Sequence, residues 1–105
     1  MSGKAPAVAY VNANLFITES EVARVRESME RFADEWCYDL DSIHVEDRAS
    51  GRSAFNSMVT RLTTEDITTV LVPSLHHFAG IGHPIEVKDH LQLLTAGRVI
   101  PTGTT

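Results

Sequence analysis

Residues 68–80 have the sequence TTVLVPSLHHFAG, and this stretch decides the fold. The run TTVLV at residues 68–72 is apolar and β-branched, which predicts a strand that is buried on both faces. Pro73 ends that strand, because proline cannot donate a hydrogen bond to a neighbouring strand. The connection that follows contains two adjacent histidines, His76 and His77. These histidines are the first candidates for a functional site, because they follow directly on a strand end.

Three other short runs have the composition of strands. They are AVAYV at residues 7–11, SIHVE at residues 42–46 and RVIP at residues 98–101. Each is rich in apolar and β-branched residues, which favour a pleated and largely buried strand. Together with residues 68–72 they predict four strands.

A helix is predicted after the first strand. Thr18 and Glu21 have the spacing of a capping box, which starts a helix. Apolar residues then recur at alternating steps of three and four, and these form its predicted buried face: Val22, Val25, Met29, Phe32 and Trp36.

Two shorter helices are predicted further along the chain. The second has an apolar face with the same kind of spacing, at Phe55, Met58, Val59 and Leu62. The third starts with Pro84 in its first turn. Its inward side chains are predicted to be Ile85, Leu91 and Leu94. Gly97 is expected just past its end, at the C′ position.

The resulting order, β-α-β-α-β-α-β, predicts an α/β fold with three layers. A mainly parallel four-stranded sheet is expected to carry helices on both faces. We expect one domain over residues 1–105, with a flexible leader at residues 1–6 and a tail at residues 102–105. Sites in such sheets form at the carboxyl ends of the strands. Residues 12–14, 46–53 and 73–80 should therefore contain any site.

Composition narrows the possible functions. The chain has 105 residues and a formal net charge of −5. Its basic residues form no stripe, so no independent nucleic-acid binding is expected. No run approaches the ~18 apolar residues of a membrane span. Cys37 is the only cysteine, which excludes an internal disulfide and predicts a reducing, cytoplasmic location. Its position between Trp36 and Tyr38 predicts a buried thiol.

Several α/β functions require motifs that the sequence lacks. A phosphoreceiver needs acidic residues after the first strand to hold Mg²⁺, and this chain has Asn12 and Asn14 there. Neither the G-x-G-x-x-G pattern of dinucleotide binding nor the P-loop pattern is present. The G-x-S-x-G pattern of hydrolases is also missing, and one cysteine cannot form a thioredoxin-like pair.

The run EDRASG at residues 46–51 places Asp47 at a strand end, followed by Ser50 and Gly51. Tyr10 lies in the first strand, and VLVPSL in the third strand is followed by HHFAG. In these features the chain resembles the catalytic domain of the serine recombinases (resolvases and invertases) over residues 7–101. The resemblance implies the strand order 2-1-3-4. It also implies that the site lies at the carboxyl ends of the strands.

The resemblance further implies that recombination chemistry has been lost. Aligned with the family's Tyr-x-Arg-x-Ser motif, Asn12 replaces the arginine and Asn14 replaces the nucleophilic serine. An amide nitrogen cannot attack a phosphodiester as a hydroxyl does. Aligned with the family's Leu-Asp-Arg-x-x-Arg motif, His76 and His77 replace the aspartate and the first arginine. Neutral histidine lacks the permanent charge and the forked donors of a guanidinium.

The positions of this vacated site are Tyr10, Asn12, Asn14, Asp47, Ser50, Gly51, Arg52, Asn56, His76 and His77. Asn56 falls near a further arginine of the family, with Arg52 close by. Asp47 is predicted to cap or brace the loop that contains Ser50 and Gly51.

The leading hypothesis is a catalytically inactive, resolvase-like domain that acts through protein–protein contacts, with itself or with a partner protein. A first alternative is that the vacated site binds a small molecule or a phosphate. A second is a hydrolase or metal-dependent enzyme that uses the loop with His76 and His77. The histidine spacing matches no established ligand pattern, so no metal and no cofactor are expected.

Overall fold

The computed structural model describes residues 4–16, 18–47 and 52–103. Its strands and helices are β1 (Ala5–Asn12), α1 (Glu19–Glu35), β2 (Tyr38–Glu46), α2 (Ser53–Thr64), β3 (Thr69–Val72), α3 (Pro84–Thr95) and β4 (Arg98–Pro101). Two short 3-10 helices follow strands, η1 (Ala13–Leu15) after β1 and η2 (Leu75–Phe78) after β3.

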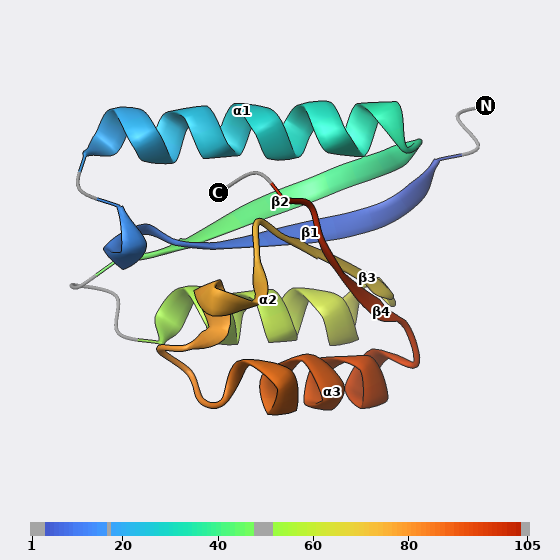
Figure 1. Ribbon diagram of the computed structural model, residues 1–105. Helices are drawn as coiled ribbons and strands as arrows, with labels where there is room; N and C mark the ends of the chain where they lie inside the picture. The colour runs from blue at the N-terminus through green and yellow to red at the C-terminus, as the bar shows by residue number, and fades with distance from the viewer. Residues whose placement is uncertain (1–3, 17, 48–51, 104–105) are drawn as a thin grey trace.

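The four strands form one sheet in the order β2-β1-β3-β4, and every neighbouring pair is parallel. Helix α1 covers one face of the sheet, and α2 and α3 cover the other (Figure 1). The predicted three-layer α/β fold is therefore confirmed, as is the strand order. In this arrangement the carboxyl ends of β1, β2 and β3 all point to one edge of the sheet.

The core lies on both faces of β1. Val8 and Tyr10 face α2 and α3, where they pack with Met58, Phe78 and Leu91. Toward α1, the packing involves Ala7, Ala9, Val11, Val25 and Met29. Every residue of β1 from Ala7 to Asn12 is buried, as expected for a central parallel strand that has helices on both sides.

Helix α1 begins as its sequence predicts and ends differently. Thr18 accepts a hydrogen bond from the Glu21 backbone N–H at 3.2 Å, and the Glu21 carboxylate accepts one from the Thr18 N–H at 3.1 Å. This confirms the capping box. The prediction that Trp36 is buried is wrong, because α1 ends at Glu35 and the indole is 64% exposed. Cys37, predicted to be buried, is exposed and turns the chain with a positive φ of 60°.

The apolar face of α2 is confirmed, with Phe55, Met58 and Leu62 buried. Helix α3 starts at Pro84 as predicted, but its inward face is different. Ile85 and Leu94 are exposed, whereas Val87 and Leu91 are buried. Residues four positions apart share one side of a helix. Val87 and Leu91 therefore point together at the sheet and turn Ile85 away from it.

The end of α3 also differs from the prediction. The left-handed residue there is Ala96, with a φ of 53°, and not Gly97. Gly97 is needed for a different reason. A Cβ atom at this position would lie 1.8 Å from the carbonyl oxygen of Thr68, so only glycine fits against the start of β3.

Strand β2 is longer than predicted, since it starts at Tyr38 instead of residue 42. The first half of β2 is not recognisable as a strand because its sequence, Asp39-Leu40-Asp41-Ser42, is mostly polar. Ala7 pairs with Leu40 and Val8 pairs with Ser42, so Asp41 is an extra residue that bulges out of the ladder. Residues of β2 beyond the bulge alternate regularly: Ile43 and Val45 pack toward α1.

Candidate functional site

The carboxyl ends of β1 and β3 are joined by the side chain of His77. Its Nδ1 atom accepts a hydrogen bond from the Asn12 backbone N–H at 2.9 Å. The pairing between β1 and β3 ends at Ala9 and Leu71. The chain continues from the end of β3 into η2. The imidazole therefore accepts the hydrogen bond of the Asn12 N–H, for which a neighbouring strand supplies no carbonyl group.

Burial and bonding fix the chemistry of this imidazole. His77 is fully buried, and its ring lies 5.6 Å from that of Phe16. Since Nδ1 accepts a hydrogen bond, the proton of the neutral ring sits on Nε2. Burial, and then the charge of nearby His76, lower the pKa of His77 from 6.5 to about 4. At neutral pH the ring is an uncharged acceptor and cannot act as a cationic phosphate ligand.

The Nε2 atom of His77 is buried and has no hydrogen-bond partner within residues 4–16, 18–47 and 52–103. A buried N–H without an acceptor costs roughly 1–3 kcal/mol. Such a group in a native protein calls for an explanation, such as a water molecule or a ligand. It is the one feature of the described strand ends that points beyond the fold itself.

Asn12 and Asn14 are also engaged with each other. The Asn12 side-chain oxygen accepts a hydrogen bond from the Asn14 backbone N–H at 3.0 Å, which caps η1. Asn12 is buried and Asn14 is exposed. The side-chain amide of Asn12 therefore serves the turn at the end of β1.

A second polar cluster links β1, β2 and α2. The Tyr10 hydroxyl donates to the Glu46 carboxylate at 2.9 Å. The same carboxylate accepts hydrogen bonds from the backbone N–H groups of Ala54 and Phe55, both at 3.0 Å. Glu46 thus caps α2 from a neighbouring strand and places its charge at the positive end of the helix. Burial raises the pKa of Tyr10, and the bonded Glu46 raises it further, so the phenol stays protonated.

Sequence reasoning missed Glu46 and chose its neighbour Asp47. Glu46 is buried, whereas Asp47 is exposed. The sequence alone did not identify Glu46, because the start of α2 after Arg52, without a side-chain capping bond, is known only from the structure. A helix start without a local cap needs a remote acceptor. Ser50 and Gly51 lie outside the described residues, and with them the predicted bracing of their loop by Asp47.

The remaining described candidates, Arg52, His76 and Asn56, have different surroundings. Arg52 donates a hydrogen bond to the carbonyl oxygen of Ile81. His76 is exposed on η2. Asn56 lines an open groove of about 610 Å³ along α2, together with His44, Ser57 and Arg61. The structure therefore joins Asn12 to His77 and Tyr10 to Glu46, and it places Asn56 elsewhere.

The groove along α2 borders a grouping of serine, histidine and aspartate side chains. Ser42 Oγ lies 2.9 Å from His44 Nε2 and 3.1 Å from Asp41 Oδ2. Arg61 donates to both oxygens of Asp41, at 2.7 and 2.9 Å, and these bonds hold the pKa of Asp41 below its usual range. A catalytic triad needs the carboxylate on the histidine. Here the carboxylate contacts the serine, so the grouping anchors the bulge of β2 to α2.

Comparison with protein-family models, curated proteins and solved structures found no match to this chain. Across the described residues, no three histidine, cysteine, aspartate or glutamate side chains are arranged to hold a metal ion. No helix in that part of the chain is both long enough and apolar enough to cross a membrane.

Proposed function

We propose that this chain is a catalytically inactive, resolvase-like α/β domain that acts through protein–protein contacts and does not cleave DNA. The observation that carries the proposal is the bond between Asn12 and His77 at the carboxyl edge of the sheet. Two positions that would hold a phosphate in an active relative are tied to each other, and a third, Asn14, carries an amide. Each of these described groups stabilises a turn or a strand end, and none carries the hydroxyl nucleophile that a serine recombinase needs.

The surface supports a role in binding. Leu93 on α3 is 84% exposed and Trp36 at the end of α1 is 64% exposed. Large apolar side chains that are open to this extent are typical of contact residues when they occur with other exposed apolar groups. Ile85 and Leu94 on α3 are also exposed. A protein partner or a second copy of the chain would cover such side chains.

The test is a strand-cleavage assay on supercoiled plasmid, with detection of any covalent protein–DNA adduct. We expect no relaxation and no adduct. An adduct that disappears when Ser53, Ser57 or Ser74 is changed to alanine would overturn the proposal. The mass of the chain in solution, measured by light scattering across a concentration series, distinguishes self-association from a role that needs a different partner.

The buried Nε2 atom of His77 favours a second candidate function, which is binding of a small acceptor such as phosphate at the strand ends. Thermal unfolding with and without inorganic phosphate tests it. A ligand present at 100 times its Kd stabilises the native state by about 2.7 kcal/mol. An unchanged melting temperature at high phosphate removes this candidate.

A further inference from the structure

Trp36 is the single tryptophan of the chain and lies directly after the last residue of α1. Its ring stacks on Phe32, with the ring centres 5.8 Å apart and the planes at 29°. Because Phe32 is partly buried against the core on the α1 side of the sheet, it holds the indole in place and leaves much of Trp36 open to solvent. An exposed tryptophan that stacks on a partly buried ring is the kind of residue that dominates binding interfaces.

A small hollow lies on the flank of α1 beside these rings. It has a volume of about 180 Å³ and is lined by Ser28, Arg31, Phe32 and Glu35. This is smaller than the roughly 300–1,000 Å³ of small-molecule pockets. The size suits one side chain of a partner.

The charge around the rings is unusual for the end of a helix. The last turn of α1 contains Asp34 and Glu35 and no basic residue. Acidic side chains there oppose the partial negative charge of the helix C-terminus. Lys4 pairs with Asp34 at 3.3 Å. Glu35 and the exposed Asp39 have no ion-pair partner in the described chain, so the end of α1 favours an added cation.

We propose that Trp36, Phe32 and Glu35 form a docking surface for an arginine side chain on a basic segment of a partner protein. The inference rests on the proposed function, because it assumes that the chain acts through protein contacts. The guanidinium stacks on the exposed indole, its aliphatic stem lies over Phe32, and its charge faces Glu35 and the carbonyl groups that end the helix. An acidic partner would be repelled by the same groups.

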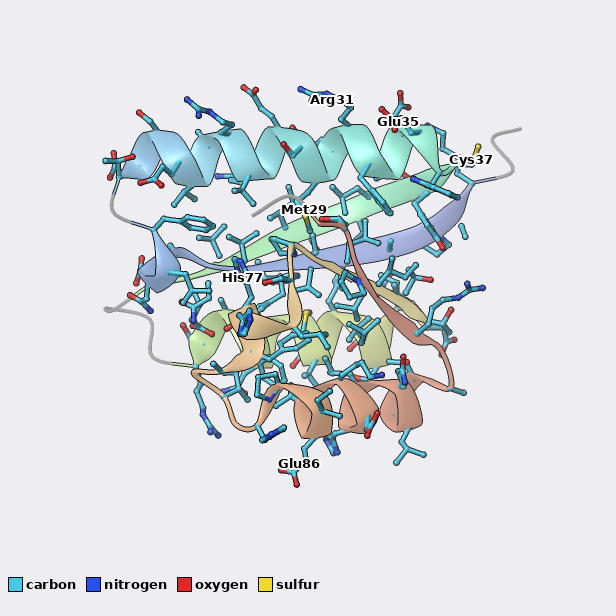
Figure 2. All side chains as sticks on the ribbon, in the orientation of Figure 1. Met29, Arg31, Glu35, Cys37, His77 and Glu86 are labelled. Atoms are coloured by element: carbon cyan, nitrogen blue, oxygen red, sulfur yellow. The ribbon has the colours of Figure 1, made fainter. Side chains whose placement is uncertain are left out.

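A substitution of Arg31 tests whether the occupant of the docking surface is basic or acidic. It lines the hollow and points outward from α1, near Glu35 (Figure 2). A positive charge there opposes an incoming arginine, so removing it with Arg31→Gln should strengthen binding. If the natural occupant were acidic, the same change would weaken binding.

The experiment uses the full chain and a capped peptide of alternating arginine and glycine. Tryptophan fluorescence with acrylamide quenching reports on Trp36 alone, since no other tryptophan is present. We expect a saturable protection of Trp36, lost in about 1 M salt, where the screening length is about 3 Å. Glu35→Lys should weaken binding about tenfold and Arg31→Gln should strengthen it about threefold.

Two matched controls lie on α3, which packs on the opposite face of the sheet. Glu86→Lys makes the same charge change on an outward-pointing residue (Figure 2), and Leu93→Ala removes another exposed apolar side chain. Both should leave peptide binding unchanged. Trp36→Ala, followed by calorimetry, should weaken binding about tenfold. Its midpoint of unfolding should stay close to that of the parent chain, because the indole is exposed.

Equal protection by a glutamate–glycine peptide, normal binding by Glu35→Lys, or weaker binding by Arg31→Gln would each overturn the docking surface. Failure here is distinguishable from failure of the proposed function. A chain that forms no DNA adduct but ignores the arginine peptide keeps its proposed function and loses this surface. A chain that forms the adduct loses the proposed function whatever the peptide does.

Discussion

Single side chains complete the hydrogen bonding that the backbone leaves open at the carboxyl edge of the sheet. His77 supplies an acceptor for the last N–H group of β1, across a sequence separation of 65 residues. Glu46 supplies an acceptor for two N–H groups at the start of α2. Buried backbone groups without partners are rare in native proteins. These two residues are therefore expected to contribute more to stability than their polar character alone suggests.

The first prediction concerns the pH dependence of stability. The unfolded chain has a histidine pKa near 6.5 and the folded chain has a pKa of about 4 at His77, so the unfolded state binds the proton more readily. The contribution of His77 is complete above pH 6.5 and is lost as pH falls through 4. By linkage it amounts to about 3 kcal/mol between neutral pH and pH 4.

Urea unfolding of the parent chain and of His77→Gln at pH 7, 5 and 4 measures this contribution. The stability difference between the two proteins should shrink as pH falls, because only the parent chain loses the histidine term. The other titratable groups contribute equally in both proteins, so their effects cancel in the stability difference. Two curves that run parallel across this range would contradict the assignment of His77.

The second prediction concerns the pair formed by Tyr10 and Glu46. Glu46→Ala removes the cap of α2 and leaves the buried Tyr10 hydroxyl unbonded, with an expected loss of about 3 kcal/mol. Tyr10→Phe should cost about 1.5–3 kcal/mol, because a hydrogen bond to a buried carboxylate is lost. The double variant should lose less than the sum of the two, since both remove the same bond.

Chemical denaturation of the four proteins in this cycle gives the coupling. Tyr38→Phe is the matched control, because the Tyr38 side chain is only partly buried and lies at the start of β2. It should change stability by less than about 0.5 kcal/mol. Strict additivity at Tyr10 and Glu46 would mean that their bond contributes nothing.

At the scale of elements, the ends of helices and strands carry most of the specific information. The capping box starts α1, a remote carboxylate starts α2, and Pro84 starts α3. The end of α3 is set by a close approach between Gly97 and the backbone at Thr68. Strand β4 begins directly after this contact, since the Arg98 N–H donates to the carbonyl oxygen of Thr68 at 2.9 Å.

The third prediction tests this close approach. Gly97→Ala would place a Cβ atom 1.8 Å from a backbone oxygen, so β4 or α3 must shift and stability should fall by more than about 2 kcal/mol. The control is Gly82→Ala, whose new Cβ atom would make an ordinary contact with Val87 at 3.5 Å. Thermal unfolding should leave the control within about 1 kcal/mol of the parent chain. Equal stability of the two variants would show that the end of α3 adapts freely.

At the scale of the whole molecule, the regular spacing of apolar residues predicted the architecture. Local departures from that spacing were not predicted. The apolar spacing of Phe55, Met58 and Leu62 and the β-branched run at residues 68–72 predicted elements that the structure contains. Parallel strands also explain why Asn12 and His77 meet at one edge, as their strand-end positions suggested. The periodic patterns succeed because burial of apolar surface dominates folding.

The exceptions depend on three-dimensional partners that no periodic pattern contains. Which of two adjacent histidines is buried depends on how η2 is turned, and His77, not His76, faces the sheet. The role of Glu46 depends on where α2 begins relative to β2. The exposure of Trp36 depends on the helix ending one residue earlier than its apolar stripe. The first two of these are decided by how two elements meet, and the third by where one helix ends.

The bulge at Asp41 has a consequence for how copies of the chain behave together. Strand β2 lies at the edge of the sheet and is nine residues long, and a long flat edge invites pairing with other chains. Asp41 interrupts the edge as an extra residue, and its pairing with Arg61 keeps a carboxylate at this edge. Deletion of Asp41 should restore a continuous ladder and yield concentrated solutions that gain β-sheet aggregates, visible as rising light scattering and thioflavin binding. The single bulged residue in β2 is thus expected to limit pairing between the sheet edges of different copies of the chain.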